Sequence, residues 1–310
     1  MSAKVPSGVA LTLWHSAGPR VALSAETLSL LARARPDAVM LHGGPSIFRA
    51  DGERAPEALA VAQALRAAMP GMRLWFGVGC DGIAKRVRSG ADTAVQAIER
   101  IAIVARLGAS LGVEALVFDA EGAWKSASTS PFAQQARALV PELYAAARRE
   151  APAVALGMTS FDQPMLHGVF PWSAWCGDAT CDFAMPQVYA APDKGPAHPG
   201  ALPRRFERHA ASWALAVEKG WIRADLPRMP YLQAHGVEAA ETITALVGAN
   251  TCALWSTPAR IDTAGAAALE AAMKLRRMGL DVAAFQREKG LVVDGICGPI
   301  TRAALGVDTG

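Results

Sequence analysis

Short apolar runs alternate with longer alanine-rich stretches of helical periodicity from Val9 to Arg277. Runs that are apolar on both faces are typical of strands in a parallel sheet that is covered on both sides. The pattern therefore predicts eight strands, at Val9–Trp14, Ala38–His42, Arg73–Val78, Ala115–Asp119, Ala153–Met158, Phe183–Tyr189, Met229–Gln233 and Cys252–Ser256.

Helical patterns lie between most of these strands, and one more follows the eighth. The periodicity predicts helices over Ala25–Arg35, Glu57–Ala68, Asp92–Leu111, Pro131–Glu150, Pro203–Lys219, Val237–Val247 and Thr263–Arg277. This number of strand–helix alternations favours a closed (β/α)8 barrel of the TIM type, which belongs to the α/β class. An open doubly wound sheet is the alternative, but no G-x-G-x-x-G motif follows the first strand.

Two longer connections follow the fifth and sixth predicted strands, at Thr159–Asp182 and Ala190–Leu202. Connections of this length on a barrel are usually functional. Because they follow strands, we expect them at the C-terminal face, where barrel active sites lie.

The composition permits a large buried core. The chain has 310 residues, of which 52% are hydrophobic and 19% charged, and its formal net charge is +3. This length accommodates one large domain and one small one. The small basic excess fits an anionic target surface, but it fits an ordinary protein surface as well.

The cysteines argue against a disulfide framework, because they are odd in number and scattered: Cys80, Cys176, Cys181, Cys252 and Cys297. Cys176 and Cys181 are close enough in sequence to pair. No Cys-x-x-Cys motif or histidine-rich cluster indicates a metal site. We therefore expect no metal and no other cofactor.

The N-terminal residues do not form a signal-peptide pattern, because the apolar run Val9–Trp14 is too short for the hydrophobic region of one. No apolar stretch is long enough for a transmembrane helix. We expect synthesis in the cytoplasm as a soluble chain without a signal peptide.

The C-terminal part reads D-V-A-A-F-Q-R-E-K-G-L-V-V-D-G-I-C-G-P-I-T-R-A-A-L. A short helix with Phe285 and Gln286 is expected to end at Gly290, a residue type that favours the end of a helix. A D-G turn follows at Asp294. A second helix is expected to begin at Pro299, with Ile300, Ala304 and Leu305 on one of its faces.

The motifs A-F-Q, G-L, V-D-G-I, G-P-I-T and A-A-L in this segment resemble the second half of the bacterial peptidoglycan-binding domain, type 1. The resemblance implies a barrel at 1–278 and a wall-binding segment at 279–310. Because that domain is normally longer, the segment is either a half-unit or uses the helix Thr263–Arg277 as well. A generic helical hairpin that caps the barrel is the alternative. The expected contact residues of the wall-binding segment are Phe285, Gln286, Leu291, Asp294 and Thr301, and we expect Phe285 and Leu291 to be core residues of its two helices.

The fourth predicted strand ends in a D-x-E motif formed by Asp119 and Glu121. Side chains alternate along a strand, so both carboxyl groups are expected on the same side at the C-terminal face. Two carboxylates this close repel, and a partly enclosed site raises the pKa of one of them. One carboxyl group can then serve as a general acid while the other stays charged. A surface salt bridge or a helix-terminal acid pair is the alternative.

Other strand ends supply candidate binding residues. Gln187 and Tyr189 share a face at the end of the sixth strand, and Trp255 lies near the end of the eighth. Aromatic faces suit the apolar face of a sugar ring, so these residues and the acid pair predict a sugar-binding pocket. A core role is the alternative for each one alone. Further strand-end candidates are His15, His42, Asp81, Gln233 and His235.

The motifs F-D-A-E, M-P-Q-V-Y and A-L-W-S resemble the family 18 glycoside hydrolases, the chitinase-like barrels. The resemblance implies that Glu121 protonates the glycosidic oxygen. It also implies that Asp119 orients the substrate's own N-acetyl group as nucleophile, and that Tyr189 hydrogen-bonds this group. That route is an exception to the two-carboxylate scheme. The family usually has a further aspartate two residues before Asp119, where this chain has Val117.

Family 25 lysozymes also carry D-x-E on a barrel strand and cut peptidoglycan. They normally have an aspartate on the first strand, where this chain has Trp14 and His15. Both resemblances stay open. Barrel and tail together resemble a phage endolysin, which implies a lysozyme- or N-acetylglucosaminidase-like hydrolase of phage or prophage origin.

The partner implied by this resemblance is bacterial peptidoglycan at the cell wall. We expect a monomer with no nucleic-acid partner. A catalytically inactive barrel that binds glycan is the first alternative, and a barrel enzyme with another substrate is the second.

Overall fold

The computed structural model describes residues 5–14, 24–43, 55–126, 129–178, 180–189, 200–233, 239–248, 251–256 and 263–307. Eight parallel strands pair in chain order, and β1 also pairs with β8, so the sheet closes into a barrel. This confirms the predicted (β/α)8 fold. The strands are β1 (Gly8–Trp14), β2 (Ala38–Gly43), β3 (Arg73–Gly79), β4 (Ala115–Asp119), β5 (Ala155–Phe161), β6 (Phe183–Gln187), β7 (Tyr231–Gln233) and β8 (Thr251–Ser256).

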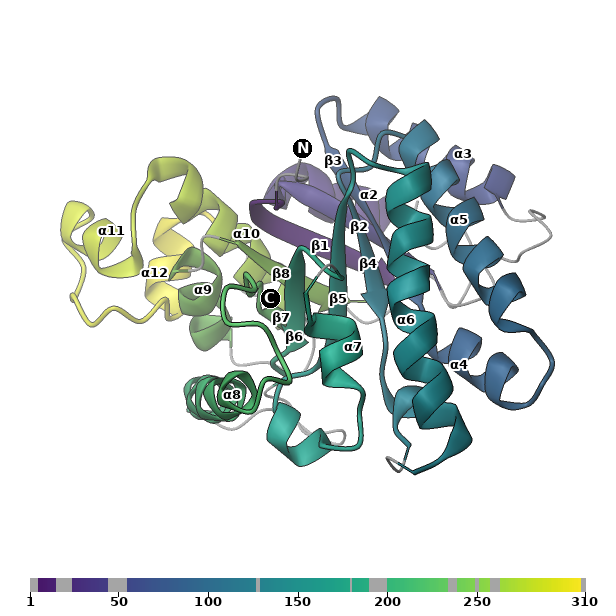
Figure 1. The fold of residues 1–310 in the computed structure, drawn as a ribbon. Helices are drawn as coiled ribbons and strands as arrows, with labels where there is room; N and C mark the ends of the chain where they lie inside the picture. Colours follow the sequence, from purple (N-terminus) through teal and green to yellow (C-terminus); the bar gives the residue numbers. More distant parts are fainter. Residues whose placement is uncertain are drawn as a thin grey trace.

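Helices surround the strands, with α3 to α6 on one side and α8 to α10 on the other (Figure 1). They are α2 (Ala25–Ala34), α3 (Ala55–Ala68), α4 (Asp81–Arg88), α5 (Ala94–Ser110), α6 (Pro131–Glu150), α7 (Trp172–Cys176), α8 (Ala201–Glu218), α9 (Ala239–Gly248), α10 (Thr263–Met278), α11 (Val282–Glu288) and α12 (Pro299–Ala304). Two 3-10 turns are η1 (Gly122–Trp124) and η2 (Pro164–His167). Among the described residues, no helix is both long and apolar enough to cross a membrane.

The start of α5 differs from the prediction by two residues. Thr93 caps the helix and forms a capping box with Gln96, in which each side chain bonds the other residue's backbone N–H. Asp92 instead binds Arg86 at 2.7 Å and Arg100 at 3.1 Å. The acidic residue at the predicted start therefore fixes the preceding turn, and threonine provides the cap.

The barrel interior is filled with side chains of unequal size. Large inward-facing residues such as Trp75 and Phe183 lie among alanines, and Gly157 leaves the space that the Phe183 ring occupies. Interdigitation of large and small residues is how such barrels avoid a central pore. The inward cluster comprises Ala10, Ala38, Met40, Trp75, Ala115, Val117, Ala155, Phe183, Met185, Met229, Tyr231 and Ala253.

Strand β5 lies further along the chain than the pattern predicts, and it includes residues that we assigned to a loop. Thr159 is buried in the barrel and its hydroxyl donates to the Met185 carbonyl at 2.8 Å. Phe161 pairs in register with Gln187. The polar sequence T-S does not fit an apolar strand pattern, but the Thr159 hydroxyl is satisfied by a barrel carbonyl rather than by water. The following connection also contains α7, in which Trp172 and Trp175 are buried.

The C-terminal segment folds as two short helices beside α10 (Figure 1). Phe285 is buried, as predicted, and Gly290 adopts the left-handed conformation that ends α11. Lys274 of α10 donates to the carbonyls of Leu305 and Gly306 at 3.1 and 2.8 Å. The segment therefore uses α10 as a third helix, in line with one of the two predicted arrangements.

Two details of that segment were predicted wrongly. Leu291 is only partly buried, so it is not a core residue. Ile300 is 74% exposed and Ala304 is exposed, whereas Thr301 and Leu305 are buried. The inward face of α12 is therefore rotated by one residue from the predicted face, because the buried Gln286 amide recruits the Thr301 hydroxyl at 3.1 Å.

Candidate active site

The two acidic residues of the D-x-E motif lie at the C-terminal end of β4. Asp119 is the last residue of the strand, and Glu121 directly precedes η1. Both side chains are partly buried. In barrels of this type, the residues at these strand ends line the active site.

Gln187 connects the two carboxyl groups. Its Nε2 lies 2.5 Å from Glu121 Oε1 and 3.4 Å from Asp119 Oδ1. Gln187 is the last residue of β6, two strands from β4, so barrel closure brings the three residues together. The Gln187 amide donates to both acids and therefore links the two carboxyl groups.

His42 contacts Asp119 from within the barrel. Its Nε2 lies 3.1 Å from Asp119 Oδ2, and its side chain is 1% exposed. Gly77 is its register partner on β3, and a Cβ there would overlap the imidazole ring. The imidazole therefore occupies space that only glycine at position 77 leaves free. His42 is a neighbour of the acid pair inside the barrel rather than a residue on its surface.

Asp81 positions Glu121 through the backbone, a role that the sequence did not reveal. Its carboxylate accepts from the Glu121 N–H at 2.8 Å and from the Ala123 N–H at 3.1 Å. Asp81 is the first residue of α4. The G-V-G-C-D-G sequence, which runs from the end of β3 into α4, was the signal from which a role at this strand end could have been predicted. An acid at this point fixes the turn that carries Glu121.

The surroundings of Glu121 raise its pKa from 4.5 to about 7. Burial is the largest cause and the charge of Asp119 the second, while the hydrogen bond from Gln187 acts in the opposite direction. The charge of Asp81 and a hydrogen bond with Asp119 raise the pKa further. A carboxyl group that holds its proton near neutral pH is suited to general acid catalysis.

Tyr189 lies next to this group of residues. Its ring centroid is 6.1 Å from that of Tyr231 in an edge-on arrangement. Burial raises the Tyr189 pKa well above its usual value, and the nearby Tyr231, Asp119 and Glu121 raise it further. The phenol therefore remains protonated and can donate a hydrogen bond.

The remaining predicted binding residues are placed only in part. Gln233 ends β7 and pairs in register with Trp255 of β8. The backbone of Trp255 is in the strand, but its side chain lies outside the described part of the chain. His15 and His235 also lie outside the described residues.

The described residues contain no group of three or more His, Cys, Asp or Glu side chains that could hold a metal ion. Cys176 and Cys181 are both buried and carry free thiols. Among the described residues, neither such a metal-binding group nor the two thiols therefore contribute to the chemistry of the acid pair.

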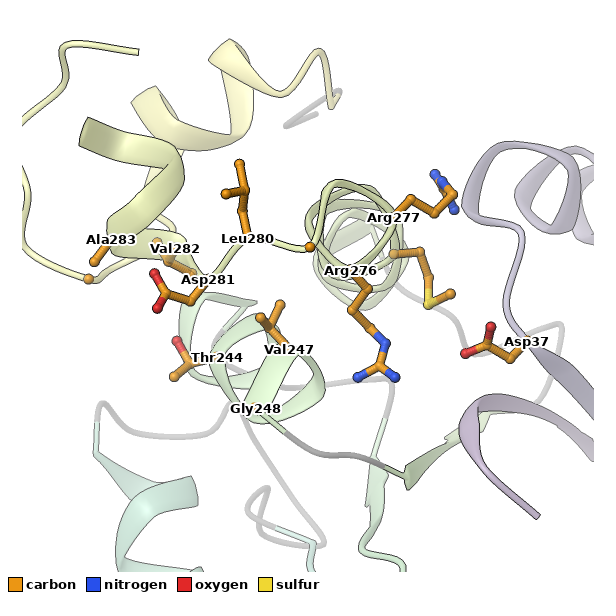
Figure 2. A pocket seen from close by; sticks show the side chains of 13 residues that line it. Asp37, Thr244, Val247, Gly248, Arg276, Arg277, Leu280, Asp281, Val282 and Ala283 are labelled. Carbon is orange, nitrogen blue, oxygen red and sulfur yellow. The ribbon is translucent and has the colours of Figure 1, made fainter. Parts of the chain in front are cut away.

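A separate cavity of about 780 Å³ lies at the opposite end of the barrel. It is lined by residues of α9, α10 and the start of α11, and by Asp37, which directly precedes β2 (Figure 2). The Arg276 guanidinium projects into this space (Figure 2). Because the amino ends of the strands support stability rather than catalysis in such barrels, this cavity is distinct from the candidate site.

In the C-terminal segment, Gln286 organises the loop between the two helices. Its Nε2 lies 2.8 Å from Asp294 Oδ1 and 3.0 Å from the Ile296 carbonyl, and its Oε1 accepts from the Gly295 N–H at 3.0 Å. Both polar atoms of the buried Gln286 amide are thus hydrogen-bonded within the segment. Of the predicted contact residues, Gln286, Asp294 and Thr301 therefore have a structural role in the loop.

No protein-family model matches the chain, and neither does the sequence of any curated protein. Solved structures do resemble it. A chitinase-like agglutinin from Robinia pseudoacacia has a TM-score of 0.58 at 12% identity and covers 85% of this chain and 99% of its own. A GH5_18 protein from Streptomyces cattleya, solved with GlcNAc, has a TM-score of 0.57 at 15% identity, with coverage of 88% and 81%.

A chitinase from Chromobacterium violaceum gives a TM-score of 0.52 at 13% identity and covers 85% of this chain and 98% of its own. Identities this low show the fold alone. The chain thus has a TIM barrel of the kind found in chitinases and other glycoside hydrolases.

Proposed function

We propose that the chain is a glycosidase that cuts the glycan strand of bacterial peptidoglycan. The observation that carries this proposal is the acid pair on β4, in which Gln187 contacts both carboxyl groups and the pKa of Glu121 is about 7. A carboxyl group that holds a proton near neutral pH at a barrel strand end is the general acid that glycoside hydrolysis requires.

In this mechanism Glu121 donates its proton to the glycosidic oxygen as the bond breaks, and the N-acetyl oxygen of the substrate bonds to the anomeric carbon. Water then displaces that oxygen and returns a proton to Glu121. Asp119, held by His42 and Gln187, orients the N-acetyl group of the substrate. The Tyr189 hydroxyl donates a hydrogen bond to the carbonyl of that group. Family 18 enzymes usually have an aspartate where this chain has Val117, and valine cannot form a polar contact with Asp119. His42 provides the polar contact with Asp119 instead.

The C-terminal segment supports peptidoglycan as the substrate. Its motifs resemble half of a peptidoglycan-binding domain, and its surface exposes Val292, Val293, Ile296 and Ile300. A barrel joined to a wall-binding segment is the arrangement of phage endolysins, so we propose a phage or prophage origin and action at the cell wall.

Release of dye from labelled peptidoglycan tests the proposal directly. Glu121→Gln keeps the shape and the contact with Gln187 but removes the transferable proton, so the rate should fall at least about a hundredfold. Glu114→Gln is the matched control, because Glu114 precedes the same strand at its other end and pairs with Arg73. Dye release by the Glu121→Gln protein at the parent rate would contradict this mechanism.

A non-catalytic glycan-binding barrel is the second candidate, because the first comparison structure is an agglutinin. The same assay separates the two. An enzyme releases dye, whereas a binder sediments with the wall without releasing it. Mass spectrometry of the released fragments would then identify the bond that is cut from the sugar at the reducing end.

A further inference from the structure

One cation close to the acid pair has no part in the proposed catalysis. Lys125 directly follows η1, four residues after Glu121. Its Nζ lies 4.0 Å from the centroid of the Phe161 ring. In the described part of the chain, no carboxylate forms an ion pair with this ammonium group.

The backbone fixes Lys125 relative to Glu121. The Trp124 N–H donates to the Glu121 carbonyl at 3.1 Å, and the Lys125 N–H donates to the Gly122 carbonyl at 3.2 Å. The buried Trp124 indole donates to the Cys80 carbonyl at 3.1 Å. The general acid and the lysine therefore belong to one rigid turn.

Phe161 links the lysine to the other side of the acid pair. It pairs in register with Gln187, whose amide lies 2.5 Å from Glu121. In the described part of the chain the Lys125 ammonium group contacts the Phe161 ring and forms no ion pair with Glu121 or Asp119. It therefore lies beside the acid pair and is free to meet another group of a bound glycan than the bond that is cut.

The other charged groups around Phe161 are already matched or neutral. The His167 imidazole stacks on the Phe161 ring with centroids 3.9 Å apart. Burial, Lys125 and Arg205 lower the His167 pKa to about 4, so the ring is neutral at physiological pH. Arg205 binds the buried Asp162 at 2.6 Å. Lys125 is therefore the cation around Phe161 that no described carboxylate neutralises, so its charge can bind an anionic ligand.

We propose that Lys125 is a specificity-determining residue that binds a carboxylate of peptidoglycan, on the peptide stem or, where no peptide is attached, on the lactyl group. This inference rests on the proposed function and narrows its substrate class. Chitin-like glycans are neutral and offer no partner for the ammonium group. The Phe161 ring holds the ammonium by a cation–π contact that leaves its charge available to an anion.

Binding of three probes to the full chain tests this inference, in the Glu121→Gln background so that no probe is cut. The probes are a peptide-bearing muroglycan tetrasaccharide, the same glycan without peptide, and an N-acetylglucosamine tetrasaccharide. Lys125→Met keeps the length and the aromatic contact but removes the charge. It should weaken binding of the peptide-bearing probe about tenfold, the usual effect of losing one charged hydrogen bond.

Binding of the neutral tetrasaccharide should be unchanged, and Lys125→Arg should retain most of the binding of the anionic probe. Weakened binding of the peptide-bearing probe alone would identify the stem carboxylates. Weakened binding of the peptide-free glycan alone would identify the lactyl carboxylate, which is free only in that probe because the stem is joined to it as an amide. Lys219→Met is the matched control. Lys219 also lies over an aromatic ring, that of Trp221, but it follows the far end of α8, about 21 Å along that helix from Arg205.

Equal losses for neutral and anionic probes, or no loss for either, would overturn the inference and leave the proposed function standing. If the protein with Lys125 intact bound none of the three probes, the proposed function would fail, and this inference would fail with it.

Discussion

At the scale of single residues, Glu121 and Asp119 show how surroundings assign roles to two similar acids. Gln187 contacts both acids, but Asp119 also contacts His42, whereas Glu121 is buried beside the negative charges of Asp119 and Asp81. Burial beside other acids favours the protonated form of the Glu121 carboxyl group. The pair is therefore asymmetric before any substrate binds.

The pH dependence of the rate follows from this asymmetry. Glu121 must be protonated to act as an acid, and its pKa is about 7. We expect kcat/KM for peptidoglycan to fall above this pH, by about tenfold per pH unit. A rate that stays constant up to pH 9 would contradict the role of Glu121 as proton donor.

The same pKa predicts an effect on stability. Because the folded pKa is raised above 4.5, the contribution of Glu121 is fully present below pH 4.5 and is lost as pH rises through about 7. Glu121→Gln removes this loss, so at pH 8 it should be more stable than the parent by about 1–3 kcal/mol. Thermal unfolding at pH 4 and pH 8 checks this. Equal destabilisation at both values would show that Glu121 is a packing residue.

At the scale of elements, the pairing of β2 with β3 determines the support of the acid pair. His42 and Gly77 are register partners, and the missing side chain at Gly77 makes room for the buried imidazole. The contact between His42 and Asp119 therefore depends on a glycine on a third strand. Register, rather than sequence spacing, creates this part of the site.

Gly77→Ala should displace the His42 ring and cost about 1–3 kcal/mol of stability, as overpacking usually does, together with most of the activity. Gly248→Ala is the matched control, since a Cβ there meets no atom within 4 Å. In a double-mutant cycle with His42→Ala, the stability losses should not add, because the second change removes the clash. Full additivity would mean that the two positions act independently.

At the scale of the whole molecule, the C-terminal segment is joined to the barrel through α10 and carries exposed apolar side chains. Val292 is 81% exposed and Ile300 is 74% exposed, while Phe285 and Leu305 are buried in the core. Exposed apolar side chains that gather on one small segment are typical of an interaction surface. The segment therefore combines exposed apolar side chains with a buried core that packs on the barrel.

Replacing Val292 and Ile300 by serine should weaken sedimentation with purified peptidoglycan about tenfold, because the apolar contact area is lost. Thermal unfolding should change little, since both side chains are exposed. Val95→Ser is the control, because Val95 is 71% exposed but lies on α5 of the barrel. Unchanged sedimentation of the double variant would exclude this face as the wall contact.

The sequence by itself predicted the eight strands, with shifted ends in some of them, and the neighbouring positions of two acids at the end of β4. The bounds of β4 were predicted residue for residue, because Ala115–Phe118 is a buried apolar run that ends at a carboxylate. The two-residue period of a strand predicted Asp119 and Glu121 on one side. Glu121 lies just beyond the strand, and Gln187 contacts both acids. The predicted strands and the positions of the two acids depend only on near neighbours in the chain, which a local pattern records.

Only the tertiary structure decided which distant groups meet the acid pair. Gln187 lies 66 residues from Glu121, and His42 and Asp81 come from two other strand ends. Their contacts depend on the register of neighbouring strands and on barrel closure, and no local pattern records either. The same reason explains why the Lys125–Phe161 contact and the outward face of Ile300 were absent from the sequence prediction.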